Sequence, residues 1–103
     1  MVYNAPLLTG IELTSQEIKM LADEDVVHAV KWSHLEVSRI HDTRLLCGLN
    51  FPIFAGIDVI AFEAMAVGAD GWISGLPMME PKLARRLHRL QVCEKDLKAA
   101  RDL

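Results

Sequence analysis

Lys31 is the residue whose type and position say most about possible chemistry. It follows the mostly apolar run 26–30, which predicts a buried strand that ends at the lysine. Burial disfavours the charged form of an ammonium group, and a neutral amine can attack a carbonyl carbon to form a Schiff base. The other interpretation is a lysine whose alkyl stem packs while its head reaches solvent at the rim of a sheet. Residue type and placement alone favour this second, structural role.

Other residues at the predicted strand ends also allow two interpretations. Tyr3 is either an amphipathic packing residue or a proton relay whose hydroxyl faces the same edge as Lys31. Asp58 precedes a predicted helix and is typical of an N-cap. Gly56 and Gly75 fit sharp turns, although glycine also lets a ligand approach the backbone closely.

Four short apolar runs, each followed by helix signals, would position these residues. The predicted strands are 2–3, 26–30, 51–55 and 71–74. Helical crossovers between apolar strands predict an α/β fold with a parallel sheet covered on both faces. Two architectures fit this order, part of a (β/α)8 barrel or a small doubly wound sheet that binds an anion at a helix N-terminus. Both place their chemistry at the carboxyl ends of the strands.

The helix signals lie between these strands. Capping boxes are predicted at Thr14–Glu17 and Ser33–Glu36, and Asp58 is expected to cap a helix over 59–67. Pro81 suits the first turn of a basic helix whose arginines are expected to form a solvated face. A further helix is expected over 95–103.

Composition restricts the function classes. The 103 residues, 51% hydrophobic and 24% charged, fit one domain, and the longest uncharged stretch, 45–57, is too broken to span a bilayer. No signal-peptide pattern is present at the N-terminus. The net charge of −3 argues against nucleic-acid and membrane partners. The two cysteines and four scattered histidines predict neither a disulfide framework nor a metal site, and favour packing thiols in the cytoplasm.

Four segments together resemble one enzyme family. Tyr3–Pro6, Lys31, Phe54–Asp58 and Gly68–Ser74 are similar in order and spacing to the second half of the dihydrodipicolinate synthase and N-acetylneuraminate lyase family. The resemblance implies strands 5–8 of a (β/α)8 barrel. Residues 1–90 would form this half-barrel of four βα units, and residues 91–103 would begin a C-terminal helical extension.

The same resemblance implies roles for individual residues. Lys31 would form the Schiff base with pyruvate or another 2-oxo acid, and Tyr3 would relay protons. Ile73 would contact the pyruvate, and Gly56 and Asp58 would belong to the substrate-binding set. The implied reaction is that of a class I aldolase or lyase, which needs no metal or organic cofactor.

Departures from the family pattern leave two functional hypotheses. Val59 stands where sialate lyases carry the second member of an acidic pair. A complete barrel of this type needs about 250 residues, and the family's Gly/Thr-rich carboxylate-binding loop belongs to the half that this chain does not contain. The chain is therefore expected to act as an aldolase when a second copy or a complementary half completes the barrel. The alternative is an inactive, self-associating half-barrel or interaction module. Both predict an oligomer, because four barrel strands leave two unpaired edges and an uncovered apolar face.

Overall fold

The computed structural model describes residues 1–103 as a four-stranded sheet with its helices. Along the chain the elements are β1 (Val2–Asn4), α1 (Pro6–Thr9), α2 (Ser15–Asp23), β2 (Val30–Trp32), α3 (Ser38–Cys47), β3 (Ile53–Ala55), the 3₁₀ turn η1 (Asp58–Ile60), α4 (Ala61–Ala66), β4 (Gly71–Trp72), α5 (Leu76–Met79), α6 (Pro81–His88), the π-helical η2 (Arg89–Cys93) and α7 (Leu97–Arg101). None of the helices has the length and apolar character that a membrane crossing requires.

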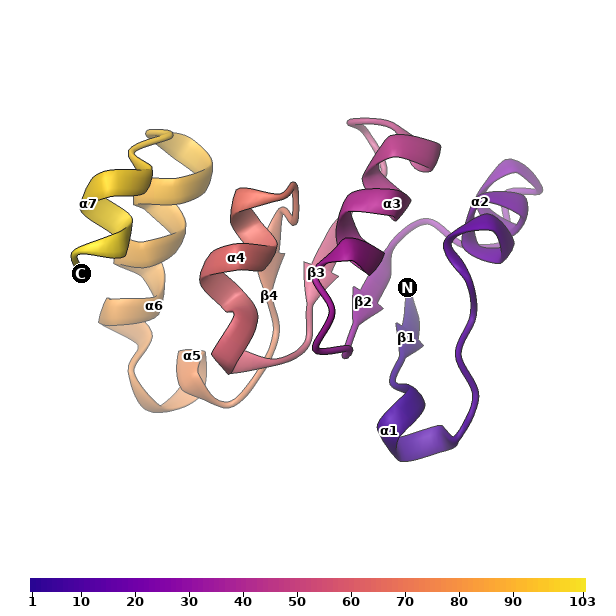
Figure 1. The fold of residues 1–103 in the computed structure, drawn as a ribbon, viewed down its shortest axis with the longest axis horizontal. Coiled ribbons are helices and arrows are strands. Elements are labelled where there is room, and N and C mark those ends of the chain that lie inside the picture. Colours follow the sequence, from indigo (N-terminus) through magenta and orange to yellow (C-terminus); the bar gives the residue numbers. More distant parts are fainter.

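The order of the strands distinguishes the two architectures that the sequence left open. All neighbouring strands are parallel, and the sheet runs β1-β2-β3-β4 in sequence order. A doubly wound sheet reverses its strand order at a switch point, whereas a barrel adds each new strand on the same side. The structure therefore has the arrangement of a barrel segment, with the carboxyl ends of the strands along its lower edge beside α1 and α5 (Figure 1).

Only one face of the sheet is covered, so the expectation of cover on both faces is wrong. Val30, Trp32, Ile53 and Ala55 point into the helix layer and are 0% exposed. Successive side chains of a strand point to opposite faces, so the residues between them lie on the other side. On that side Tyr3 is 50% exposed. The crossover helices all return to the same face, as the right-handed connections of a barrel require.

The second strand begins later than the apolar run indicates. Strand β2 starts at Val30, and Lys31 lies in its middle, not after its end. The amide groups of Val26 and Val27 both donate to the carbonyl of Leu21, which ties them to the end of α2. Because their amides are used in terminating the helix, these two valines cannot enter the sheet ladder. Strands β3 and β4 are likewise shorter than predicted, at Ile53–Ala55 and Gly71–Trp72.

The capping predictions have mixed outcomes. The box at Thr14 is confirmed, with the Glu17 amide donating to the Thr14 hydroxyl and the Thr14 amide donating to the Glu17 carboxylate. The predicted box at Ser33 is wrong, because α3 begins five residues later, at Ser38, without a side-chain cap. The prediction for Asp58 is also wrong. It opens η1, and its carboxylate bonds elsewhere, while α4 begins at Ala61.

The two helices predicted near the C-terminus form close to where the sequence places them. Pro81 stands in the first turn of α6, as predicted. The last helix forms over Leu97–Arg101 and is capped by the Asp96 carboxylate, which accepts from the amide of Ala99. It packs against α4 and η2. The domain boundary expected near residue 90 stays a prediction.

Arg44, on α3, connects that helix to the starts of β3 and β4. Its guanidinium donates to the carbonyls of Gly48, Phe51 and Gly68, and it forms an ion pair with Asp70 at 2.7 Å. The same Asp70 oxygen accepts from the Ile53 amide. The Arg44 side chain is 11% exposed and that of Asp70 is 44% exposed, so the guanidinium itself is largely shielded from water.

We predict that Arg44→Leu lowers the free energy of unfolding by about 3 kcal/mol, because it leaves a carboxylate and three carbonyls without their donor. Urea denaturation measures this difference. Arg101→Leu is the control, since the Arg101 pair with Asp102 is exposed and its loss should change stability by less than about 0.5 kcal/mol. Equal effects of the two substitutions would contradict the role given to Arg44.

Candidate functional site

The open face of the sheet places Tyr3 and Lys31 side by side. The parallel register pairs Tyr3 with Lys31 and Lys31 with Phe54, and Phe54 is paired with Gly71, so these four residues form one row across the sheet. The Lys31 ammonium nitrogen lies 4.2 Å from the centroid of the Tyr3 ring. This is the geometry of a cation–π contact. The two residues that sequence reasoning selected first are therefore in direct contact.

Gly56 makes room for the lysine. It follows β3 on the same face, and a Cβ built there would lie 3.0 Å from Lys31 Cε and 1.9 Å from Ser33 Oγ. Any other residue would displace both side chains. A glycine at this position therefore leaves space first for the Ser33 hydroxyl and then for the stem of Lys31.

Ser33 is a member of this site that sequence reasoning missed. It lies two residues after Lys31 and is 8% exposed, and its hydroxyl has no hydrogen-bond partner in the chain. A buried hydroxyl without a partner costs free energy, which makes it a ready donor to an entering oxygen atom. The period of two along the strand could have identified it, but the predicted capping box assigned its hydroxyl to a helix.

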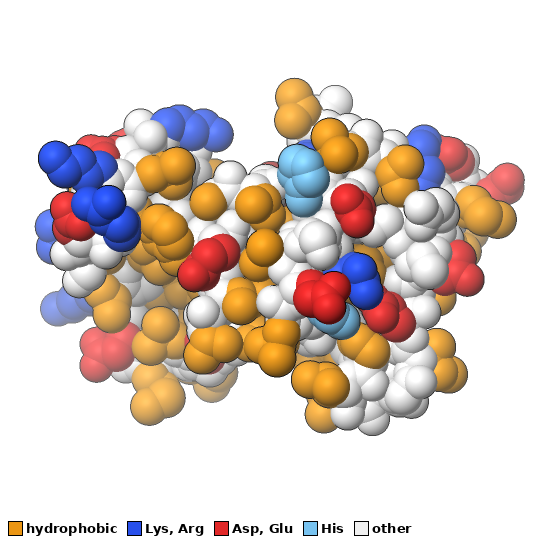
Figure 2. Space-filling model, in the orientation of Figure 1, with side chains coloured by type: hydrophobic (Ala, Val, Ile, Leu, Met, Phe, Trp, Pro, Cys, Tyr) orange, Lys and Arg blue, Asp and Glu red, His pale blue; other side chains and the backbone are white.

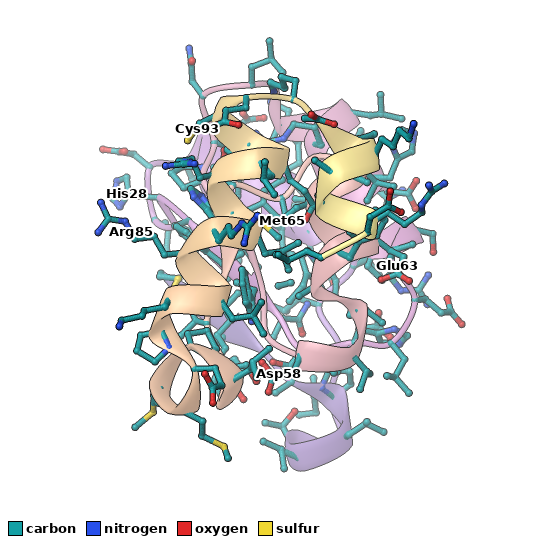
Figure 3. The ribbon with its side chains drawn as sticks, turned by 90° about the vertical axis from the view of Figure 1, so that its left-hand side faces the viewer. His28, Asp58, Glu63, Met65, Arg85 and Cys93 are labelled. Atoms are coloured by element: carbon teal, nitrogen blue, oxygen red, sulfur yellow. The ribbon has the colours of Figure 1, made fainter.

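Asp58 fixes the end of β4. Its carboxylate accepts from the Trp72 indole at 3.1 Å and from the Leu76 amide at 3.2 Å. Gly75 lies beside it, where a Cβ would come within 3.6 Å of the carboxylate. Figure 3 shows Asp58 at the lower end of the molecule, beneath α4 and α6. Asp58, which follows β3, thus connects β3 to the end of β4 at the edge where the strands end. The substrate contact expected of Asp58 stays a prediction.

Ile73 lies on the far side of Phe54 from the lysine. It is 43% exposed and lines, with Phe54, Gly71 and Trp72, a groove of about 360 Å³ along β4. Lys31 does not line this groove. The structure thus brings Tyr3, Lys31 and Gly56 together, and it places Ile73 two strands away across the same face.

The two groups with shifted pKa values, Arg39 and Cys47, lie outside the row of Tyr3, Lys31, Phe54 and Gly71. A hydrogen bond to Glu12 raises the pKa of Arg39, which joins the loop after α1 to α3. Burial raises the pKa of the Cys47 thiol, which packs against the core. No three His, Cys, Asp or Glu side chains gather as metal ligands. The chemistry available on the open face is that of a primary amine beside a phenol and a free hydroxyl.

Comparisons with known proteins show which family the chain belongs to. The family model of the dihydrodipicolinate synthetase family matches residues 1–102. The 4-hydroxy-tetrahydrodipicolinate synthase of Pelobacter propionicus is 31% identical over 86 residues, which are 84% of this chain and 30% of that protein. The enzyme of Trichlorobacter lovleyi is 33% identical over 81 residues, which are 79% of this chain and 28% of that protein.

Solved structures show the same fold. Dihydrodipicolinate synthase from Aquifex aeolicus superposes with a TM-score of 0.90 at 31% identity, covering 97% of this chain and 34% of that one. A prophage protein of the dihydrodipicolinic acid synthase family from E. coli K12, solved in complex with pyruvate, gives 0.86 at 27% identity and covers 97% and 35%. The chain spans about a third of the length of these relatives. The chain belongs to the dihydrodipicolinate synthetase family.

Proposed function

We propose that this chain carries the Schiff-base half of an aldolase or lyase site, in which Lys31 forms an imine with pyruvate or another 2-oxo acid. Its four strands would correspond to strands 5–8 of the family's barrel. The observation that carries the proposal is the position of the Lys31 amine, which lies on the open face of a parallel sheet and against Tyr3. A pyruvate complex of a related protein supports the substrate class.

The reaction would begin with attack of the neutral Lys31 amine on the ketone carbon. The carbon–nitrogen bond forms, the carbonyl oxygen takes a proton, and loss of that oxygen as water leaves the iminium. Tyr3 would supply and remove the protons of this dehydration. The iminium then accepts the electron pair when the adjacent carbon–carbon bond breaks, or stabilises the carbon nucleophile when that bond forms.

Neighbouring groups would orient the 2-oxo acid. The Ser33 hydroxyl has no partner within the chain and is available to a substrate oxygen. Because Gly56 has no side chain, the stem of Lys31 can pass along β3. Asp58 would act through the turn after β4, which carries Ile73. These roles, and a cytoplasmic location, stay predictions.

The alternative hypothesis, an inactive half-barrel that acts as an interaction module, is favoured by one observation. On the uncovered face of the sheet, Tyr3 is 50% exposed and Lys31 is partly exposed. A site that does not exclude water orients its substrate less well, and the loss of positioning lowers the rate. Imine formation by the chain distinguishes the two hypotheses.

We expect incubation with pyruvate and borohydride to increase the mass of the chain by one reduced pyruvyl group, because borohydride traps the iminium as a stable amine. Intact-protein mass spectrometry measures the product. Lys31→Ala should abolish the increase, and Lys98→Ala, which removes an exposed lysine of α7, should leave it unchanged. An adduct that persists in Lys31→Ala would overturn the proposal.

Replacement of Tyr3 by phenylalanine tests the proton relay. Tyr3→Phe retains the ring beneath the ammonium and removes only the hydroxyl, so we expect trapping about 100-fold slower with an unchanged final adduct. Time-resolved trapping across a range of pH measures the rate. If the role of Tyr3 is purely structural, Tyr3→Phe should be trapped at the wild-type rate. The trapping rate should then fall only in Tyr3→Leu, which removes the ring.

A further inference from the structure

The sheet ends in two free edges that match each other. Strand β1 pairs only with β2, and β4 pairs only with β3, so one side of each outer strand has unused backbone groups. The order is sequential and parallel throughout. A strand placed parallel against the free edge of β4 would therefore continue the pattern, and β1 of another molecule is such a strand.

A basic stripe borders the free edge of β4. Lys82, Arg85 and Arg86 of α6 and Arg89 at the start of η2 enclose a pocket of about 260 Å³ without any other residue. Arg85 also lines the groove along β4. In Figure 3 its side chain points away from α4 and α7. The stripe thus faces the position of the next helix in a barrel.

The charges of this stripe have few partners within the molecule. Arg89 pairs with Glu94, but Lys82, Arg85 and Arg86 form no ion pair, and α6 contains no acidic residue. A solvated helix face usually mixes both signs of charge. Four cations in eight residues of a chain with a net charge of −3 are therefore unusual.

The opposite end of the molecule carries the complementary charge. Helix α2 and the turn after it hold the exposed acids Glu17, Asp23, Glu24 and Asp25, of which Asp23 pairs with Lys19 and Asp25 with His28. Met20, on the same helix, is 66% exposed and gives this side an apolar contact. Figure 2 shows Lys and Arg gathered over α6 and α7 at the left, and Asp and Glu over α2 at the right.

From these observations we propose that two copies of this chain close into an eight-stranded barrel, with β4 of each copy parallel to β1 of the other. Each helix of a βα repeat lies beside the helix of the next unit. Helix α6, which follows β4, would then pack against α2 of the partner subunit, which follows β1. The basic stripe meets the acidic helix at both junctions, related by a two-fold axis.

The number of strands favours closure into a dimer. Two copies of a four-stranded segment supply the eight strands with which a (β/α)8 barrel closes, and closure leaves no edge. It also buries the inner row of Tyr3, Lys31 and Phe54 in a shared interior. The site is incomplete without the second copy, because the face opposite Lys31 belongs to the partner subunit. The assembly rests on the fold and the charges, and does not require imine formation.

Charge reversal tests the interface. Variant X carries Arg85→Glu and Arg86→Glu, and variant Y carries Asp23→Lys and Glu24→Lys. In X both junctions bring acids against acids, and in Y both bring bases against bases. We expect each variant alone to dimerise about tenfold or more weakly than the wild type. A mixture of X and Y restores opposite charges at both junctions, so we expect a heterodimer.

Sedimentation velocity at low salt measures these states, and circular dichroism confirms that each variant is folded. The wild-type chain should sediment with twice its monomer mass, and the X–Y dimer should weaken as salt screens the charges. A folded wild-type monomer would overturn the proposal, as would open-ended oligomers, which show head-to-tail contact without closure. Dimerisation of X alone at wild-type strength would overturn the assigned interface. Borohydride trapping on the same samples reports separately on the Lys31 chemistry.

Discussion

The site depends on the parallel pairing of β2 between β1 and β3. This register places Lys31 beside Tyr3 on one face and sends Val30 and Trp32 into the helix layer. A shift of one residue would bury the lysine beneath the helices and expose the core tryptophan, which side-chain alternation and the cost of a buried charge both oppose. The helices therefore hold the Lys31 amine in position by burying the two neighbours of Lys31 in the strand. Gly56 then supplies the space that this position requires.

The order of elements could be predicted from the sequence because local signals determine it. The Thr14 capping box and Pro81 at the start of α6 are satisfied by residues within a few positions, so their interpretation does not depend on the fold. Strand limits could not be predicted in this way. Val26 and Val27 have high strand propensity, but their amides are used by the end of α2. The prediction that helices cover both faces of the sheet was also wrong. A strand whose open face carries Phe54 has the same apolar sequence pattern as a strand that is buried on both faces.

The candidate site was predictable in part, from residues that carry polar groups at the ends of the predicted strands. Lys31 and Tyr3 stand out among apolar neighbours, and their contact confirms that they share a face. Ser33 was missed because its local spacing to Glu36 fits a helix cap, while its actual surroundings come from Gly56 on the next strand. The bonds of Asp58 to Trp72 and Leu76 were also hidden, because they join residues that only the fold brings together. The surroundings of Ser33 and the hydrogen bonds of Asp58 are set by contacts between strands, which the spacing of residues along the sequence does not show.

The proposed chemistry requires that the fold select one amine, that of Lys31, for imine formation. Peptide mapping of the chain after treatment with pyruvate and borohydride tests this most directly, because Lys19, Lys82, Lys95 and Lys98 serve as internal controls in the same sample. Lys82, Lys95 and Lys98 are exposed, whereas Lys31 is half-buried against Tyr3. We expect the reduced pyruvyl group on Lys31 alone. Modification spread over the exposed lysines, with Lys31 no more modified than they are, would contradict it.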